Sequence, residues 1–132
     1  MFGPYSYAQV WSLKDLRLVV CSHTLTDEQY SQFEVLTRLL QLHVILCTAQ
    51  HHDQMLAQSL FLTHYLSQIV VKAWLENTQI DTISFGNLMD VVASVRNDTQ
   101  LFHDVRAYNP YCKEVVKQIE EPKKMVDLKL RE

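Results

Sequence analysis

The stretch Gln54–Val71, QMLAQSLFLTHYLSQIVV, is eighteen residues long and contains no Asp, Glu, Lys or Arg. An uncharged run of this length can cross a bilayer as a helix. Polar side chains are nevertheless spread right through it: Gln54, Gln58, Ser59, Thr63, His64, Ser67 and Gln68. In lipid each of them would need a partner, at a cost of several kcal/mol if unmet. The stretch is therefore predicted to be the buried central helix of a helical assembly, not a membrane span.

The composition limits the protein classes to which the chain can belong. At 132 residues it is long enough for one helical domain with a core of its own. Twelve basic residues against fifteen acidic ones, with no basic cluster, argue against a nucleic-acid partner. The start of the chain, Met1–Pro4, lacks the basic region and the apolar run of a secretory signal, so a cytoplasmic protein is expected.

Cysteine and glycine usage argues against several kinds of chemistry. The three cysteines (Cys21, Cys47 and Cys112) are far apart, and no Cys-x-x-Cys pair is present. This predicts reduced thiols, with no zinc site and no Cys-x-x-Cys redox centre. Only two glycines occur, which leaves no Gly-rich loop to hold a phosphate.

The first fifty residues have a β-α-β pattern. Leu16–Cys21 and His43–Cys47 are short apolar runs typical of covered strands. Between them, Thr26–Gln29 has the form of a capping box that opens a helix. A β-α-β order requires parallel pairing of the two strands, and two parallel strands alone are a poor structure. Residues 1–48 are therefore expected to be the trailing edge of an α/β sheet whose earlier strands this sequence does not contain.

The remainder of the sequence is predicted to be helical. The uncharged stretch extends to a long helix over residues 50–76, and a second helix begins near Thr82 or Ser84. Asn97-Asp98 can cap a third helix. Asn109-Pro110 closes the third helix and starts a fourth, since proline suits the first helical turn. Glu120-Glu121-Pro122 is expected to end or kink that fourth helix.

The expected fold class is therefore mainly α, with a short β-α-β remnant. A helical domain is expected over residues 49–121, followed by a charged, solvated tail over residues 122–132.

Histidines and an aspartate gather at the start of the uncharged stretch. His51, His52 and Asp53 could form a metal site with His64. Two histidines on one helix bind a metal when they are three or four residues apart, whereas His52 and His64 are twelve apart. The simpler interpretation is that Asp53 stabilises the first turn through the helix dipole. No metal site is predicted, and the sequence contains no defensible Ser-His-Asp or Cys-His arrangement.

Three small hydroxyl residues, Ser59, Thr63 and Ser67, lie on one stripe of the predicted long helix. Such a stripe lets another helix approach closely, or it lines a polar ligand pocket next to His64. Close packing is the more common of the two arrangements. A lone histidine among apolar residues is by default a hydrogen-bonded core residue. The residues alone thus support a helical interaction domain with a remnant of a sheet.

A set of short motifs resembles the prephenate dehydrogenase family, which includes arogenate dehydrogenases. They occur in the family's order, with eleven residues from Asp53 to His64: Met1–Pro4, Leu18–Cys21, Thr26–Glu28, His52-Asp53, Leu62–His64, Leu101-Phe102, Asp104-Val105 and Tyr108–Pro110. Such enzymes use NAD or NADP to oxidise and decarboxylate prephenate or arogenate on the route to tyrosine. Their fold is a Rossmann domain followed by an all-helical domain, similar to the C-terminal domain of 6-phosphogluconate dehydrogenase. The helical domain forms the dimer and part of the substrate site.

The resemblance implies that much of the catalytic machinery lies outside this sequence. In the family, the motif matched by Met1–Pro4 comes late in the nucleotide-binding domain. The Gly-rich turn and the catalytic Ser and His would lie upstream of it. The chain alone is therefore expected to bind no cofactor and to have no activity, although the family is an NAD(P)-dependent oxidoreductase. A homodimer through the helical domain is the expected assembly.

The resemblance also implies a substrate side formed by His64, Thr63 and Arg96. His64 matches the helical-domain histidine that contacts the substrate in relatives. Ala93 takes the place of the arginine that relatives offer to a substrate carboxylate. Arg96, three residues later on roughly the same helix face, is the expected substitute.

Leu60 and Phe61 also depart from the family's pattern at this site. Together with Ala93 they leave a second hypothesis open. In it, the chain is a non-catalytic module derived from the family that binds proteins or senses aromatic ligands.

Overall fold

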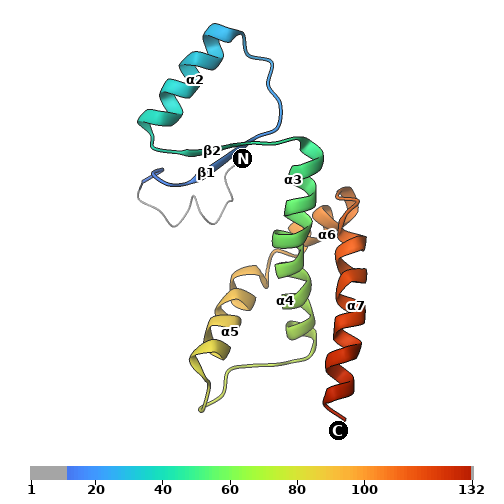
Figure 1. Cartoon of the computed structure of the whole chain (residues 1–132). Helices are drawn as coiled ribbons and strands as arrows, with labels where there is room; N and C mark the ends of the chain where they lie inside the picture. Colours follow the sequence, from blue (N-terminus) through green and yellow to red (C-terminus); the bar gives the residue numbers. More distant parts are fainter. Residues whose placement is uncertain (1–11, 132) are drawn as a thin grey trace. The chain divides into compact units, whose positions relative to one another are not determined.

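The computed structural model describes residues 12–131, so the Met1–Pro4 motif lies outside the described part. The chain divides into two compact units, one ending at His52 and the other beginning at Asp53. The elements in chain order, all but η1 labelled in Figure 1, are β1 (Arg17–Val20), α2 (Asp27–Leu39), β2 (His43–Leu46), α3 (Ala49–Leu56), the π-helical turn η1 (Ala57–Phe61), α4 (Leu62–Lys72), α5 (Ile83–Val95), α6 (Thr99–Tyr108) and α7 (Cys112–Lys129). The predicted fold class, mainly α with a short β-α-β segment, is confirmed.

The first unit contains the expected parallel pair of strands. β1 and β2 pair in parallel from Arg17↔His43 to Val20↔Leu46. The helix between them begins with the predicted capping box, in which Thr26 Oγ1 accepts from Gln29 N at 3.3 Å and Thr26 N donates to Gln29 Oε1 at 2.9 Å. The capping box holds the first turn of α2 because it satisfies two backbone N–H groups that the helix leaves unpaired.

The sheet of this unit is too small to cover α2. Thr37 is the one fully buried residue of the helix, while Leu36 and Leu39 are 54% and 75% exposed. Parallel sheets are normally covered on both faces and have more strands. The two-stranded sheet therefore leaves an apolar face of α2 exposed.

The uncharged stretch forms one continuous helical rod made of α3, η1 and α4. It ends at Lys72 and not at Glu76, because Trp74 adopts a left-handed backbone conformation with φ of 56°. One face of the rod is buried, with Phe61 and Ser67 at 2% and 3% exposure, but Leu66 and Ile69 are 44% and 49% exposed. The predicted burial thus holds for one face in the single chain. Across residues 12–131, no helix combines the length and the apolar character needed to span a membrane.

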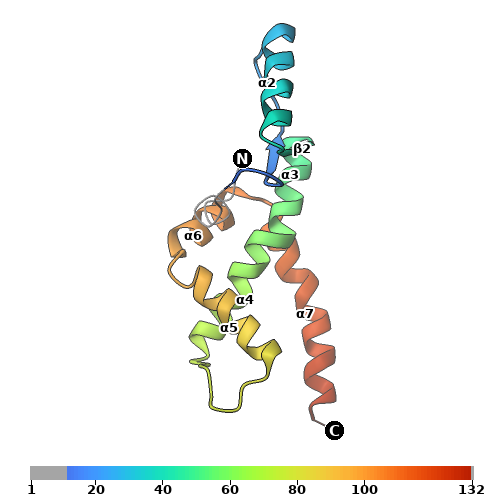
Figure 2. The ribbon, with the colours of Figure 1, turned by 90° about the vertical axis from the view of Figure 1, so that its left-hand side faces the viewer.

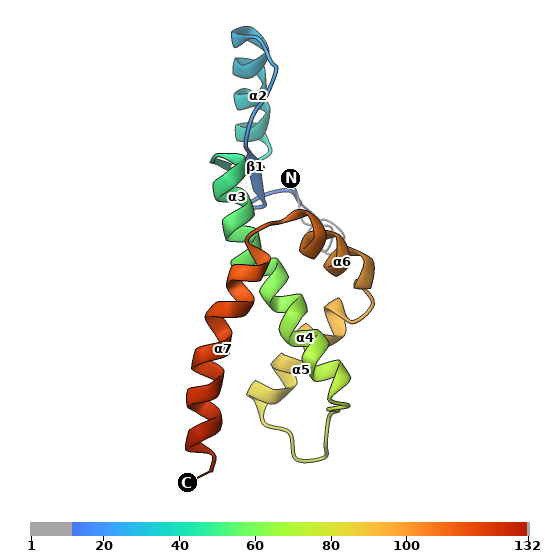
Figure 3. The same ribbon diagram turned by 90° about the vertical axis from the view of Figure 1, so that its right-hand side faces the viewer.

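Helices α5 and α6 begin near the predicted positions. Thr82 caps α5, and its Oγ1 accepts from Phe85 N at 3.2 Å. α5 packs alongside α4 after a long connection (Figures 1 and 2). α6 follows Asp98 and leads at Asn109 into α7 (Figure 3).

Helix α7 continues through Pro122 to Lys129, so the prediction that the helix ends near Pro122 is wrong. Proline removes one backbone hydrogen bond from a helix. Because Pro122 is exposed, water can satisfy the carbonyl that loses its partner. Most of the segment expected to be a tail is therefore helical.

The core of the second unit gathers around the π-helical turn. Ala57 and Phe61 of η1 are buried against Cys112 and Val115 of α7. The Phe61 ring stacks on Phe102 of α6 at a centroid distance of 5.6 Å. This core fixes η1 relative to α6 and α7, and so it fixes the start of α4, where His64 lies.

Candidate functional site

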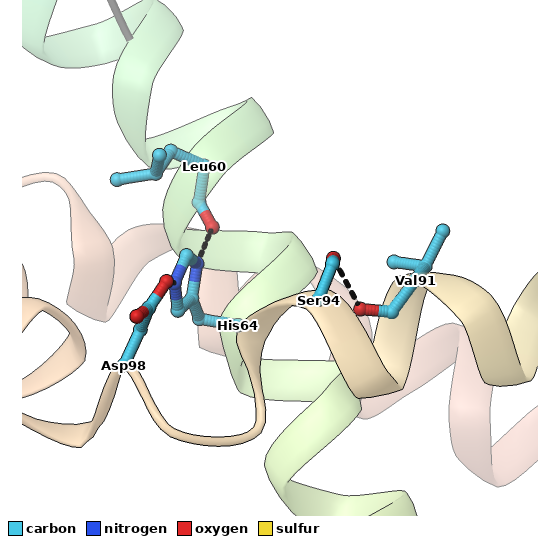
Figure 4. A network of polar contacts seen from close by, with 5 residues as sticks. All are labelled: Leu60, His64, Val91, Ser94 and Asp98. Atoms are coloured by element: carbon cyan, nitrogen blue, oxygen red, sulfur yellow. Dashed lines mark hydrogen bonds and ion pairs between the residues drawn. The ribbon is translucent and has the colours of Figure 1, made fainter. Parts of the chain in front are cut away.

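His64 is one of the two buried polar residues of α4, at 3% exposure, like Ser67. Its Nδ1 lies 2.9 Å from the carbonyl oxygen of Leu60, one helical turn earlier (Figure 4). A carbonyl oxygen only accepts hydrogen bonds, so Nδ1 carries a proton. In the neutral ring, Nε2 then presents a lone pair on the opposite side of the imidazole.

Asp98 faces that opposite side. Its Oδ2 lies 3.8 Å from His64 Nε2, and Figure 4 shows the carboxylate next to the imidazole ring. Asp98 is the N-cap residue of α6, yet its side chain makes no capping hydrogen bond. The carboxylate therefore faces His64 and accepts no hydrogen bond from the first N–H groups of its own helix.

The pair is buried on one side and accessible on the other. Within residues 12–131, His64 Nε2 is fully covered and has no hydrogen-bond partner. The Asp98 side chain is 33% exposed. A buried nitrogen without a partner costs free energy, about 1–3 kcal/mol, and calls for an explanation by a ligand, a water or a function. A solute would reach the Asp98 carboxylate first, with His64 beneath it.

The backbone at this point departs from a regular α-helix. The π-helical turn Ala57–Phe61 immediately precedes α4 and contains Leu60, whose carbonyl accepts from His64. Single π turns inside α-helices occur frequently at functional sites. Gln68, one turn beyond His64, has a second buried side-chain nitrogen without a partner in the described part of the chain. The buried face of α4 therefore carries polar nitrogens without partners on two successive turns.

The other residues predicted for the substrate side lie differently. Thr63 donates its hydroxyl to Ser59 O at 2.9 Å, so that donor is already used within the helix. Arg96 is exposed, at the C-cap of α5 and two residues before Asp98. Ala93 is also exposed. The structure thus joins His64 with Asp98, places Arg96 on the adjoining connection and gives Thr63 a local role.

Asp98 was missed as a site residue by sequence reasoning. An aspartate that follows Asn97 and precedes a helix is adequately explained as a cap. Its contact with His64 depends on how α6 packs against η1, the turn before α4, and no local pattern reports that packing.

The His51-His52-Asp53 motif lies inside α3 and does not introduce it. The helix begins at Ala49, and Thr48 Oγ1 accepts from His51 N at 3.1 Å. No acidic residue occupies the first turn, so the interpretation of Asp53 as a partner of the helix dipole is wrong. Residues 12–131 contain no group of three His, Cys, Asp or Glu side chains suited to a metal ion.

Comparisons with known proteins agree with one another. A family model described as "TYRAAT1-like, C-terminal domain" matches residues 69–132. Arogenate dehydrogenase 2, chloroplastic, from Arabidopsis thaliana is 26% identical over 126 residues, which cover 91% of this chain and 35% of that protein. The crystal structure of Synechocystis arogenate dehydrogenase matches with a TM-score of 0.58 at 17% identity, over 88% of this chain and 44% of that one.

The chain thus spans about a third of the length of the curated relative that it matches. The shared fold extends over both the β-α-β segment and the helices. The resemblance found in the sequence motifs is confirmed: over its helices and the β-α-β segment before them, the chain is similar to the C-terminal part of arogenate dehydrogenases.

Proposed function

We propose that this chain supplies the substrate side of an NAD(P)-dependent dehydrogenase that oxidises and decarboxylates arogenate or prephenate. The observation that carries the proposal is the Asp98 carboxylate, accessible to solvent and placed over the buried His64. The nicotinamide cofactor supplies the hydride acceptor when it is bound. In relatives a Rossmann domain binds it, so this chain alone is not catalytic.

The chemistry of the pair favours a ligand that donates hydrogen bonds. A carboxylate accepts hydrogen bonds only, and the neutral His64 ring also presents a lone pair at Nε2. Asp98 Oδ2 and His64 Nε2 are therefore two neighbouring acceptors, and a ligand that donates hydrogen bonds would complement both. An ammonium group supplies several N–H donors and a positive charge that compensates the carboxylate.

Arogenate carries an ammonium group where prephenate carries a ketone. Asp98 would bind that ammonium group, and the Nε2 lone pair of His64 beneath it would accept a further N–H hydrogen bond. Arogenate is therefore the favoured substrate. The names of the two similar proteins, both arogenate dehydrogenases, support this choice.

Arg96 completes the proposed substrate side. Its side chain is exposed and begins two residues before Asp98. Arginine binds carboxylates through two parallel N–H donors, and both prephenate and arogenate carry carboxylates. Arg96 would thus take over the role of the arginine that Ala93 replaces, while Asp98 distinguishes the amine from the ketone.

We also propose that the helical unit forms a homodimer. Four apolar side chains of α4 and α5 are between 43% and 49% exposed in the single chain: Leu66, Ile69, Leu88 and Val91. Exposed apolar groups on neighbouring helices are typical of association surfaces. A second copy of the helical unit would cover them.

Titration calorimetry tests the proposed substrate site. L-Arogenate should bind the chain, and Asp98→Asn should weaken its binding by about tenfold or more, because a charge-assisted hydrogen bond is lost. The same substitution should change prephenate binding by less than about threefold. Arg96→Ala should weaken both ligands, while Asp90→Asn, an exposed carboxylate on α5, should change neither. Absence of arogenate binding, or equal arogenate binding by the parent chain and Asp98→Asn, would contradict the proposal.

The exposed Ala93 favours a second candidate function. Without the family's arginine, the site could bind an aromatic amino acid without turning it over, as a sensing module. In the same calorimeter such a module would bind L-tyrosine more tightly than L-arogenate. Tyrosine binding weaker than arogenate binding would exclude this candidate.

A further inference from the structure

Two cysteines lie side by side at the carboxyl ends of the parallel strands. The last paired residues are Val20 and Leu46, and the next residues along the strands are Cys21 and Cys47. The backbone N–H of Cys47 donates to Val20 O at 3.2 Å, so the two backbone segments are still paired at this point. Neighbouring strands are about 4.8 Å apart, within the Cα separation that a disulfide spans.

The two thiols interact with each other and differ in accessibility. Both cysteines are free; Cys21 is exposed and Cys47 is half-buried. Burial raises the pKa of the Cys47 thiol, and the hydrogen bond and charge of Cys21 raise it further. Cys21 is the thiol that a reagent meets first, and Cys47 is the thiol beside it.

Cys21 also lines an open hollow in the first unit. The hollow has a volume of about 390 Å³ and is bounded by Val19, Val20, Cys21, Ser22 and His52. Carboxyl ends of parallel strands are where such sheets normally leave room for ligands. A small thiol reagent can therefore approach the Cys21 sulfur without unfolding the sheet.

We propose that Cys21 and Cys47 form a dithiol site that a low-molecular-weight disulfide, such as glutathione disulfide, oxidises to an intrachain disulfide. The Cys21 thiolate attacks one sulfur of glutathione disulfide, forms a mixed disulfide and releases one glutathione thiolate. The Cys47 thiolate then attacks the Cys21 sulfur of the mixed disulfide and releases the second glutathione. Two protein thiols are oxidised to one disulfide, one glutathione disulfide is reduced to two glutathiones, and the two protons of the thiols pass to the released thiolates.

This modification site was not expected from sequence. Cys21 and Cys47 are twenty-six positions apart in the sequence, and they become neighbours only because the strands are parallel and in register. The bond would join the ends of β1 and β2 and close a loop that contains α2. It does not depend on the proposed substrate site, which belongs to the second unit.

Peptide mapping of the folded chain tests the proposal. The reduced chain is incubated with glutathione disulfide, quenched with acid, denatured, alkylated and digested without reduction. The expected product is a peptide pair linked through Cys21 and Cys47 that has lost two hydrogen atoms, with Cys112 alkylated. Cys112 serves as the internal control, because it lies in the second unit and is 1% exposed.

Two variants separate the steps. Cys47→Ser should accumulate the Cys21–glutathione mixed disulfide about tenfold above the parent chain, because the neighbouring thiol acts at an effective concentration in the millimolar range or above. Cys21→Ser should take up far less glutathione, because the half-buried Cys47 is left alone. A stable mixed disulfide on Cys21 of the parent chain would overturn the proposal. So would a Cys47–Cys112 link, or Cys21 linked mainly between two molecules.

Discussion

The Asn109 side chain binds the backbone of Asp53 across fifty-six positions of sequence, with Nδ2 donating to Asp53 O at 2.7 Å. The other end of the same amide, Oδ1, accepts from Tyr111 N at 3.0 Å. Asn109 is 7% exposed, so both bonds are shielded from water. One side chain thus connects α3 to the turn between α6 and α7, and it holds together the two sides of the core around η1.

Removal of this amide should destabilise the helical unit. Asn109→Ala loses both hydrogen bonds and leaves buried backbone groups without partners, at a cost of about 2–3 kcal/mol. Urea unfolding followed by circular dichroism measures the change in the free energy of unfolding. Asn97→Ala, an exposed amide in the connection before α6, is the matched control and should change it by less than about 0.5 kcal/mol. Equal effects of the two substitutions would show that the connection has no structural role.

Disruption of the aromatic stack at η1 should also destabilise the helical unit strongly. Phe61 is 2% exposed, and its ring stacks between Phe102 and Tyr65. Phe61→Ala should lower the free energy of unfolding by about 3–5 kcal/mol through lost burial and the remaining cavity. Ile83→Ala at an 86% exposed position should change it by less than about 0.5 kcal/mol. A small loss for Phe61→Ala would mean that the core lies elsewhere.

The proposed dimer is tested by a substitution that introduces a charge into the proposed interface. Ile69→Glu places a carboxylate on the exposed apolar face of α4, where a partner helix would have to bury it. Multi-angle light scattering should show a dimer for the parent chain and a monomer for the variant. Val35→Glu, on the exposed face of α2 in the first unit, should remain dimeric. A monomeric parent chain, or a dimeric Ile69→Glu variant, contradicts association through this face.

The stability of the helical unit should fall at alkaline pH because of Cys112. Burial raises the pKa of its thiol above the ordinary value of 9.0, and the nearby charge of Asp53 raises it further. The contribution is fully present below pH 9.0, since both folded and unfolded chains then hold the proton. As the pH rises past that value, the unfolded chain releases the proton first, and the folded state loses stability until its own higher pKa is passed.

Urea unfolding at about pH 8 and about pH 10 measures this loss in the parent chain and in Cys112→Ala. Other groups also titrate in this range, so the difference between the two proteins is the relevant quantity. The variant should lose less stability than the parent chain between the two pH values. Parallel losses in both proteins would show that Cys112 contributes nothing to the dependence on pH.

Local signals in the sequence were sufficient where a short motif determines the structure. The Thr26–Gln29 capping box and the Thr82 N-cap act within one turn, so their helices begin as predicted. The end of the uncharged helix was missed because the positive φ that ends it occurs at Trp74, and not at a glycine, which would have signalled it in the sequence. The passage of α7 through Pro122 was missed because proline disfavours a helix locally, whereas α7 continues to Lys129.

The candidate site was predicted in part for the same reason. His64 was found because its helix and its neighbours match a family motif. Its partner Asp98 was not found, because the contact joins residues thirty-four positions apart through the packing of α6 on η1, the turn before α4. The Cys21–Cys47 pair likewise depends on strand register, which two short apolar runs do not specify.

The most direct test of the His64–Asp98 site is the ring nitrogen spectrum of His64, recorded by long-range proton–nitrogen NMR during titration with L-arogenate. In the free chain the neutral ring should show its proton on Nδ1, as required by the bond to Leu60 O. Addition of L-arogenate should shift the Nε2 resonance of His64, and it should leave the exposed His103 unchanged. Asp98→Asn should reduce the His64 shift. A ring protonated on Nε2 instead of Nδ1, or a His64 spectrum unchanged at saturating L-arogenate, would contradict the account.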